Sequence, residues 1–236
     1  MKFSIVIPIY KEKKNLSKLI SSLKKALVDY KNKYEIIFVD DDSNDGSDKI
    51  FKNIKSKKIR LLIRKEKPRD LSKSVVYGFN RSKNDNLIVM DGDLQHNPRD
   101  LRKLIAKFKK TNCDIVIGSR KLINYKEANL NPIRFVFSKL LNHLFNLLFR
   151  KEIKDPMSGF FLIKKKVFKS VEKKLILLGY KILIDIVLSS TKKLDIKEVF
   201  INFRIRDKGY SKMRLKILIQ LVLFLIIKYF RYEKKL

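Results

Sequence analysis

The stretch NLIVMDGDLQH, residues 86–96, decides the fold, because an apolar run ends in it on an acidic turn. The apolar residues 87–90 are typical of a buried strand, and the carboxylates of Asp91 and Asp93 follow directly. Side chains at the carboxyl ends of parallel strands face the crevice where α/β sheets bind ligands. Mg²⁺ is commonly held by one or two carboxylates plus substrate phosphates. Asp91, Asp93 and the amide oxygen of Gln95 are therefore predicted to hold a divalent metal, although acidic turns without a metal are also common after strands.

Outward from this stretch, apolar runs alternate with amphipathic segments. Strands are predicted over residues 3–8, 34–39, 59–63, 86–90, 114–118, 159–163 and 198–204. Helices are predicted over 16–29 (with Asn15 as N-cap), 47–54, 73–81, 98–109, 133–149 and 180–191. This alternation predicts an α/β fold with a mostly parallel central sheet. We expect one catalytic domain over residues 1–212 and an apolar helix over 213–236.

The net charge and the single cysteine limit the kinds of partner and metal site that the protein can have. The formal net charge is +32, which suits anionic partners such as nucleic acid, lipid headgroups or phosphorylated substrates. The single cysteine, Cys113, excludes an intramolecular disulfide framework and a thiolate zinc cage, and its apolar neighbours predict a buried thiol. Zinc-finger spacing and basic-aromatic RNA motifs are both missing from the sequence, so nucleic acid is not the expected partner.

The C-terminal part of the chain contains an apolar run bounded by lysines. The run covers residues 217–227, is interrupted only by Gln220, and is flanked by Lys216 and Lys228. As a helix the run would be roughly 16 Å long, well short of a bilayer core of about 30 Å. The flanking lysines favour a helix lying in one leaflet, and a buried core helix is the alternative. With no signal peptide visible, the expected location is the cytoplasmic face of a membrane, and removing residues 215–236 is expected mainly to reduce membrane recovery.

A second acidic cluster, DDDSNDG at residues 40–46, also follows a predicted strand. It is either a solvated turn that caps the next helix or a site for a nucleotide base or ribose. Two acidic strand ends about fifty residues apart are more informative than either one alone.

The full series of motifs resembles a known enzyme family. The motifs are PIYKE at 8–12, DDDSNDG at 40–46, DGDLQH at 91–96, GSR at 118–120, DPMSGFF at 155–161, GYK at 179–181 and FRIRDKGYSK at 203–212. In this order they are similar to those of family-2 inverting glycosyltransferases, and more narrowly of the dolichol-phosphate mannosyltransferase and polyprenyl-phosphate glycosyltransferase branch. The similarity covers residues 3–213.

The resemblance implies a GT-A-type, Rossmann-like fold and a metal-dependent transfer of mannose or glucose. The implied donor is GDP-mannose or UDP-glucose, and the implied acceptor is a polyprenyl or dolichyl phosphate, with inversion at the sugar. A glycan, glycolipid or protein acceptor is the alternative. The implied partners are a membrane surface and a membrane-anchor subunit, because compact relatives without membrane-spanning helices rely on partner subunits for anchoring.

The resemblance also implies roles for individual residues. The implied catalytic residues are Asp93, Arg120 and Arg206. Donor-binding residues would be Pro8, Tyr10, Glu12, Val39, Asp41, Asp91, Gly92 and Lys212. Asp91, Asp93 and Gln95 would bind Mg²⁺ or Mn²⁺, and Arg134 and Ser138, one helical turn apart, would bind the acceptor phosphate. For each basic residue, a solvated surface cation is the alternative. Gly92 departs from the family pattern, which usually has alanine between the two carboxylates.

Overall fold

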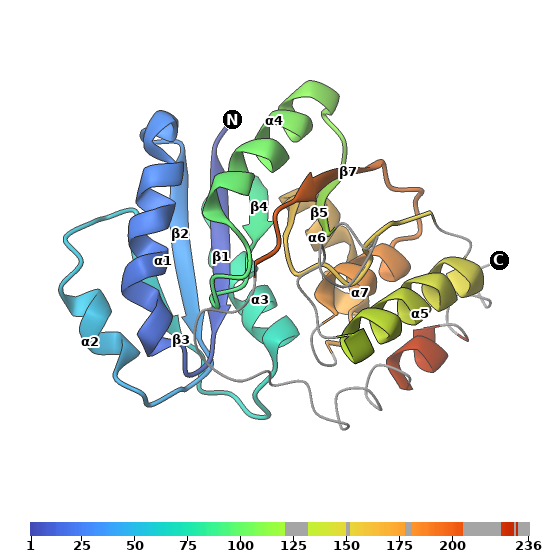
Figure 1. Ribbon diagram of the computed structural model, residues 1–236, viewed down its shortest axis with the longest axis horizontal. Helices are drawn as coiled ribbons and strands as arrows, with labels where there is room; N and C mark the ends of the chain where they lie inside the picture. The colour runs from blue at the N-terminus through green and yellow to red at the C-terminus, as the bar shows by residue number, and fades with distance from the viewer. Residues whose placement is uncertain (121–131, 150–151, 178–180, 205–222, 229, 231–236) are drawn as a thin grey trace.

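The computed structural model describes residues 1–120, 132–149, 152–177, 181–204, 223–228 and 230. In these residues one sheet has the strand order β3-β2-β1-β4-β6-β5-β7 (Figure 1). The strands are β1 (Phe3–Ile9), β2 (Tyr34–Asp40), β3 (Ile59–Ile63), β4 (Asn86–Val89), β5 (Ile115–Arg120), β6 (Phe161–Lys164) and β7 (Ile196–Ile201). β6 is antiparallel to β4 and β5, and every other pairing is parallel. The predicted α/β class with a mostly parallel sheet is confirmed.

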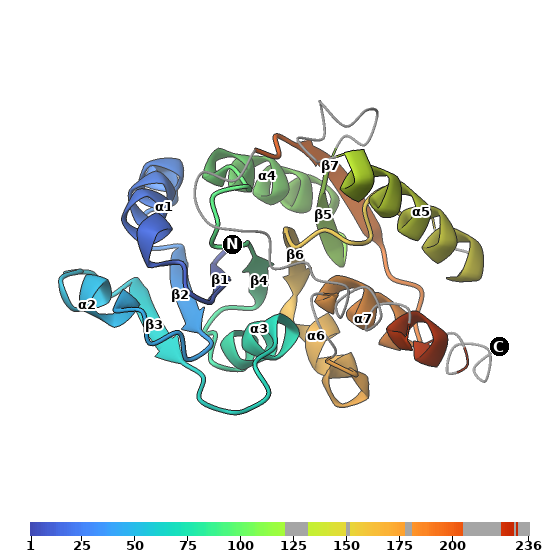
Figure 2. The same ribbon diagram turned by 60° about the horizontal axis from the view of Figure 1, so that its bottom comes forward.

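Helices cover both faces of the sheet, which explains why its inner strands are apolar runs and not alternating patterns. They are α1 (Lys13–Ala26), α2 (Ser47–Lys52), α3 (Leu71–Asn80), α4 (Leu101–Thr111), α5 (Pro132–Phe149), α6 (Lys165–Val171) and α7 (Ile182–Ser189). α1 and α4 pack on one face, and α3, α6 and α7 pack on the other (Figure 2). Cys113 is buried, as predicted.

Several element boundaries differ from the sequence-based prediction. Asn15 is not an N-cap: α1 begins at Lys13, three residues before the predicted start, and the Asn15 amide donates to the Glu12 carboxylate at 2.7 Å. α3 begins at Leu71 because Asp70 is its N-cap and accepts from the backbone N–H of Lys73 at 3.2 Å. α6 was not predicted. Among these three helices, only α3 begins at a side-chain cap, that of Asp70.

Residues 223–228 form part of the predicted C-terminal helix, and this part packs on the domain. Phe224 and Leu225 are buried, and so is Lys228. Lys228 Nζ lies 2.5 Å from Asp185 Oδ1 on α7 and donates to Ser189 Oγ at 2.6 Å. The expectation that Lys228 extends toward a leaflet is wrong, because a carboxylate 43 residues earlier in the chain binds it inside the protein. The predicted domain boundary at residues 212–213 lies outside the described residues.

Within the described part of the chain, every helix is too short or too polar to cross a bilayer.

Candidate active site

The carboxyl ends of β1, β2 and β4 meet at the point where the strand order reverses. The chain passes from β1 to β2 on one side and later returns to β4 on the other side of β1. Pro8 is paired with Val39, and the N–H of Asp41 donates to the Ile9 carbonyl at 3.0 Å. Such a switch point is where open α/β sheets bind ligands. The structure places the following predicted donor residues at these strand ends: Pro8, Tyr10, Glu12, Val39, Asp41, Asp91 and Gly92.

The two predicted metal-binding carboxylates lie on the turn after β4. Asp93 is buried, and its Oδ1 accepts from the backbone N–H of Gln95 at 3.1 Å. The side chain of Asp91 is one-third exposed. The side-chain amide of Gln95 donates to the Arg204 carbonyl at 3.2 Å, and the Arg204 N–H donates to the Gln95 carbonyl at 2.8 Å. The segment after β7 is thus attached to the turn that carries Asp91 and Asp93.

Two glycines make room for this turn. A Cβ on Gly92 would lie 2.7 Å from Ile9 Cγ2, so the side chain at the end of β1 occupies the space that alanine needs. A Cβ on Gly159 would lie 2.9 Å and 3.0 Å from the carboxylate oxygens of Asp91. The Asp91 carboxylate therefore lies directly over the backbone of the DPMSGFF segment, and no larger residue fits at position 159 without moving it.

His96 supports the turn as a neutral side chain. Burial lowers the pKa of His96 to about 4, so the imidazole carries no charge at neutral pH. Its Nδ1 accepts from the backbone N–H of Asp91 at 3.3 Å, and its ring packs against Phe160 and Phe203 with centroids 5.1 Å and 5.3 Å away. The approach of Asp91 Oδ2 to Nδ1 at 3.7 Å is consequently not an ion pair.

Arg120 is held by a buried carboxylate. Its Nε and Nη2 donate to the two oxygens of Asp155 at 2.7 Å and 2.9 Å, and its backbone N–H donates to Oδ2 at 3.1 Å. Burial disfavours the charged guanidinium, but the charge and hydrogen bonds of Asp155 and the charge of Asp91 raise the pKa of Arg120. The structure thus provides a fixed positive charge near Asp91.

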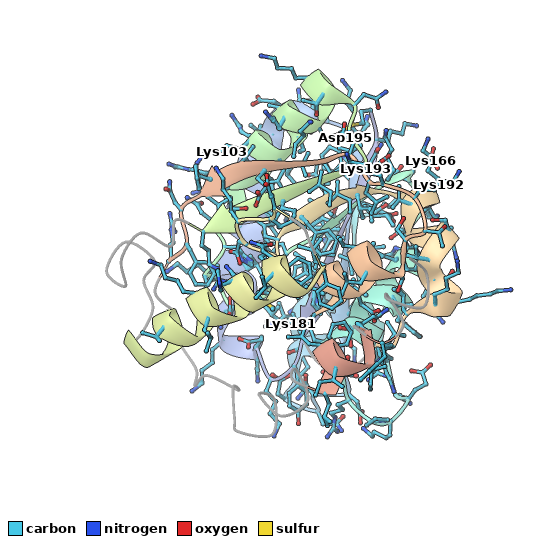
Figure 3. The ribbon with its side chains drawn as sticks, turned by 90° about the vertical axis from the view of Figure 1, so that its right-hand side faces the viewer. Lys103, Lys166, Lys181, Lys192, Lys193 and Asp195 are labelled. Atoms are coloured by element: carbon cyan, nitrogen blue, oxygen red, sulfur yellow. The ribbon has the colours of Figure 1, made fainter. Side chains whose placement is uncertain are left out.

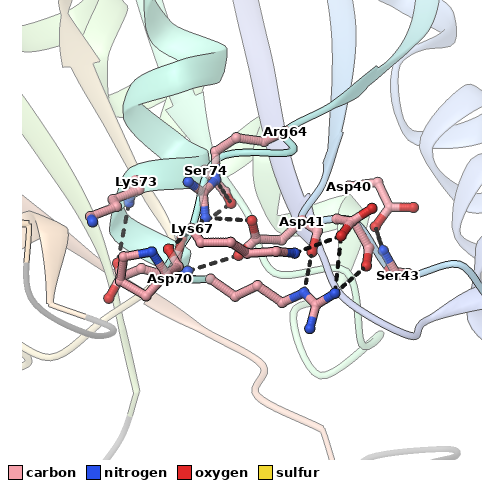
Figure 4. A network of polar contacts seen from close by, with 11 residues as sticks. Asp40, Asp41, Ser43, Arg64, Lys67, Asp70, Lys73 and Ser74 are labelled. Carbon is pink, nitrogen blue, oxygen red and sulfur yellow. Dashed lines mark hydrogen bonds and ion pairs between the residues drawn. The ribbon is translucent and has the colours of Figure 1, made fainter.

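Asp41 is engaged within the protein (Figure 4). Its Oδ2 accepts from the N–H of Asp70 at 2.8 Å, and its Oδ1 lies 2.5 Å from Nη2 of the buried Arg64, without the alignment of a hydrogen bond. Burial raises the pKa of Asp41, while the charge of Arg64 acts in the opposite direction. Spacing along the chain gave no signal for Arg64, since the pair joins the ends of two strands.

Arg69 covers the predicted nucleotide-binding tyrosine. Its guanidinium lies 5.1 Å from the ring centroid of Tyr10, and its Nε and Nη2 donate to the carbonyls of Asp41 and Asp42, each at 3.0 Å. Hydrogen bonds from Lys67 and Arg69 lower the pKa of the Asp42 carboxyl. Beside Glu12, an open groove runs between the start of α1 and residues 43–45. Sequence reasoning missed Arg69, the residue directly before Asp70.

The side chains of the remaining predicted site residues lie outside the described part of the chain. Arg134 and Ser138 lie on α5, but their side chains are outside the described part. Arg206 and Lys212 are outside the described residues altogether. Their roles stay predictions.

The carboxylates of Asp91 and Asp93 fit a hard divalent ion, although they do not form a complete metal site by themselves. Among the described residues no group of three or more His, Cys, Asp or Glu side chains is arranged around a common centre. Two adjacent carboxylates on a turn are nevertheless the protein ligands that Mg²⁺ or Mn²⁺ takes when substrate phosphates supply the others.

Comparisons with known proteins agree with this geometry. A family model described as Glycosyl transferase family 2 matches residues 4–172. The chain is 39% identical over 216 residues to a dolichol-phosphate mannosyltransferase of Pyrococcus furiosus, an alignment that covers 91% of this chain and 60% of that protein. It is 30% identical over 224 residues to a dolichol-phosphate mannosyltransferase of Mycosarcoma maydis, covering 91% of this chain and 74% of the relative.

Solved structures show the same fold. The glucosyl-3-phosphoglycerate synthase of Mycobacterium tuberculosis, determined with Mn²⁺, uridine diphosphate and glucosyl-3-phosphoglycerate, superposes with a TM-score of 0.73 at 16% identity. The superposition covers 98% of this chain and 79% of that one. The expected GT-A-type fold is confirmed. With its motifs in order around the switch point and a family match over most of its length, the chain belongs to glycosyl transferase family 2.

Proposed function

We propose that this protein transfers a hexose, mannose first among the candidates, from a nucleotide-sugar to a dolichol-type polyprenyl phosphate. The observation that carries the proposal is the similarity to dolichol-phosphate mannosyltransferases over 91% of the chain. A diphosphate donor needs positive charge around it. The fixed Arg120 would supply one such charge, and a divalent cation held by the carboxylates at the switch point would supply more.

Asp91 and Asp93 are proposed to hold Mg²⁺ or Mn²⁺, with Gln95 beside them. When bound, such an ion neutralises charge on the donor diphosphate and on the departing nucleoside diphosphate. In the proposed reaction the acceptor phosphate is already ionised near neutral pH, so no strong general base is required. Arg120, fixed by Asp155, offsets part of the repulsion between two polyanions. A single displacement at the anomeric carbon inverts it.

The reaction is tested by incubating the purified chain in membranes with polyprenyl phosphate and Mn²⁺ or Mg²⁺. Radiolabelled GDP-mannose and UDP-glucose are supplied in separate arms, and further arms omit the metal or the lipid phosphate. Label that enters the organic phase only with metal and lipid phosphate supports the proposal and identifies the donor. Label that instead enters a glycan, glycolipid or protein would replace the proposed acceptor.

Gly159→Ala is expected to weaken metal binding. The added Cβ would press on both oxygens of Asp91 at about 3 Å, so the carboxylate must move. A displacement of this size can reduce turnover about tenfold to a hundredfold. We expect half-maximal activity at a higher Mn²⁺ concentration, measured by titrating Mn²⁺ in the transfer assay.

Ser21→Ala is the control for this variant, because Ser21 is exposed in the middle of α1 and belongs to none of the motifs. Its Mn²⁺ titration should match that of the wild type. An unchanged Mn²⁺ titration for Gly159→Ala would argue against Asp91 as a metal ligand.

A membrane surface is proposed as the second partner. α5 buries Phe145 and Phe149 but exposes Val136, Leu140 and Leu147, which share one side of the helix.

A second helix, at 223–228, also has exposed apolar side chains: Leu223, Ile226 and Ile227, with Phe230 behind them 61% exposed. Both helices lie at the same end of the molecule (Figure 1). Around the face that α5 crosses lie Lys103, Lys166, Lys192 and Lys193 (Figure 3). Exposed apolar side chains edged by cations suit an anionic leaflet.

Replacing Leu140 and Leu147 by serine together is expected to lower partitioning onto anionic vesicles. Partial burial of each leucine contributes roughly 1 kcal/mol, so the pair should cost at least about tenfold in binding. Vesicle co-sedimentation measures the effect. Val28→Ser is the control, because Val28 is 55% exposed on the short helical turn that follows α1. Equal binding by the double variant and the control would remove α5 from the proposed surface.

A further inference from the structure

Residues 153–155 lie where three elements meet. From α5, the Asn146 Oδ1 accepts from the N–H of Ile153 at 3.2 Å, and the Asn142 amide donates to the Lys154 carbonyl at 2.9 Å. From β5, Arg120 reaches both oxygens of Asp155. The position of the Asp155 carboxylate therefore depends on how this short segment is held.

Glu198 on β7 holds the same segment from the other side. Its Oε2 accepts from the backbone N–H of Lys154 at 3.1 Å. Its Oε1 accepts from the N–H groups of Lys154 and Asp155 at 3.2 Å and 3.4 Å, and from the hydroxyl of the buried Ser119. One carboxylate thus joins the residue before Arg120 to the backbone of the residue that binds the Arg120 guanidinium.

This arrangement gives Glu198 an indirect connection to the site. Removing its carboxylate leaves two backbone N–H groups and one buried hydroxyl without their acceptor. Unpaired donors of this kind are costly, so the segment is expected to move until they find other acceptors. Asp155, whose carboxylate is fully buried, would move with it, and the three hydrogen bonds from Arg120 would lose their alignment.

We propose that Glu198 is a positioning residue that sets the Arg120–Asp155 pair. The proposal rests on the proposed transfer reaction, in which Arg120 acts on the donor. Neither the motifs nor the family resemblance assigned Glu198, which belongs to none of the motif segments. A purely structural role is the competing explanation, and it predicts lower stability without any dependence on Arg120.

A double-mutant cycle separates these explanations. We expect Glu198→Ala to lower kcat about tenfold to a hundredfold, with little change in the KM of the acceptor. Glu198→Gln keeps the contacts of Oε1 and loses the one of Oε2, so it should recover most of the activity. In an Arg120→Ala background, Glu198→Ala should lower kcat by less than about twofold further. Lys197→Ala, on the same strand and paired with Asp195, is the control and should match the wild type.

Three outcomes would overturn the proposal. These are full activity of Glu198→Ala, an undiminished effect of Glu198→Ala in the Arg120→Ala background, and a crystal structure of Glu198→Ala with the Arg120–Asp155 pair intact. The crystal structure tests the positioning role of Glu198 even if the wild type shows no transfer. Absence of transfer by the wild type would count against the proposed function and not against the role of Glu198. If Glu198→Ala does not fold, Ser119→Ala and Glu198→Gln are used in the same cycle, and additive effects there would equally overturn it.

Discussion

Replacing Asp93 by alanine is expected to abolish sugar transfer, with a loss of at least about a thousandfold, or roughly 4 kcal/mol of transition-state stabilisation. Asp93 is buried on the turn after β4, and one of its oxygens fixes the turn by accepting from the Gln95 N–H. Its loss removes one of the two proposed carboxylate ligands of the metal and loosens the turn that carries the other. Transfer of label to the organic phase measures the activity, and Mn²⁺ binding in the presence of GDP measures the site directly.

Asp93→Asn separates charge from shape. Its amide oxygen can still accept from the Gln95 N–H, so the turn is retained while the negative charge is lost. We expect it to lose nearly as much activity as the alanine variant. Asp48→Ala should behave as the wild type, because the Asp48 carboxylate is partly exposed on α2 and lies 3.8 Å from Lys52 Nζ. More than a tenth of wild-type turnover in Asp93→Ala would exclude Asp93 as a metal ligand.

The sequence predicted the fold where local pattern determines it. β3 has the predicted bounds, and the acidic turn after β4 lies at the switch point as expected. Apolar runs of four to seven residues suffice for such strands, because both faces of the sheet are covered. The reversed direction of β6 was beyond local pattern, since it depends on pairing with β4 and β5, which lie far away in the chain.

The candidate site was predictable in its acidic groups and not in their partners. Asp41, Asp91 and Asp93 follow strands and could be found by position alone. Arg64, which contacts Asp41, and Glu198, which holds residues 154 and 155, lie 23 and about 43 residues from the groups they bind. Spacing rules for helices and strands act over a few residues, so they carry no information about such pairs.

Lys228 is the clearest case of a residue whose environment the sequence did not reveal. An apolar run with a terminal lysine is equally compatible with a leaflet and with a protein core. The carboxylate of Asp185 decides between them, because it accepts from the backbone N–H groups of Ile176 and Leu177 at 2.8 Å and 2.9 Å and meets Lys228 with its other oxygen. Removing residues 215–236 is therefore expected to destabilise the domain as well as to reduce membrane recovery.

Lys228→Met is expected to lower the free energy of unfolding by about 3–5 kcal/mol, because it leaves the buried Asp185 charge without its cation. Both side chains are at most 3% exposed, so water does not replace the lost partner. Urea denaturation followed by circular dichroism measures the change. Lys192→Met, at an exposed lysine beyond α7, is the matched control and should unfold within about 0.5 kcal/mol of the wild type.

The double variant Asp185→Asn with Lys228→Met identifies the cause of that loss. Asparagine keeps an oxygen for the N–H groups of Ile176 and Leu177, and its amide can donate toward Ser189, while no charge remains buried. We expect it to be more stable than Lys228→Met alone, because the penalty for a buried unpaired charge exceeds that for a buried amide. Wild-type stability in Lys228→Met, with a loss only of vesicle binding, would mean that this helix belongs to the membrane and not to the core of the domain.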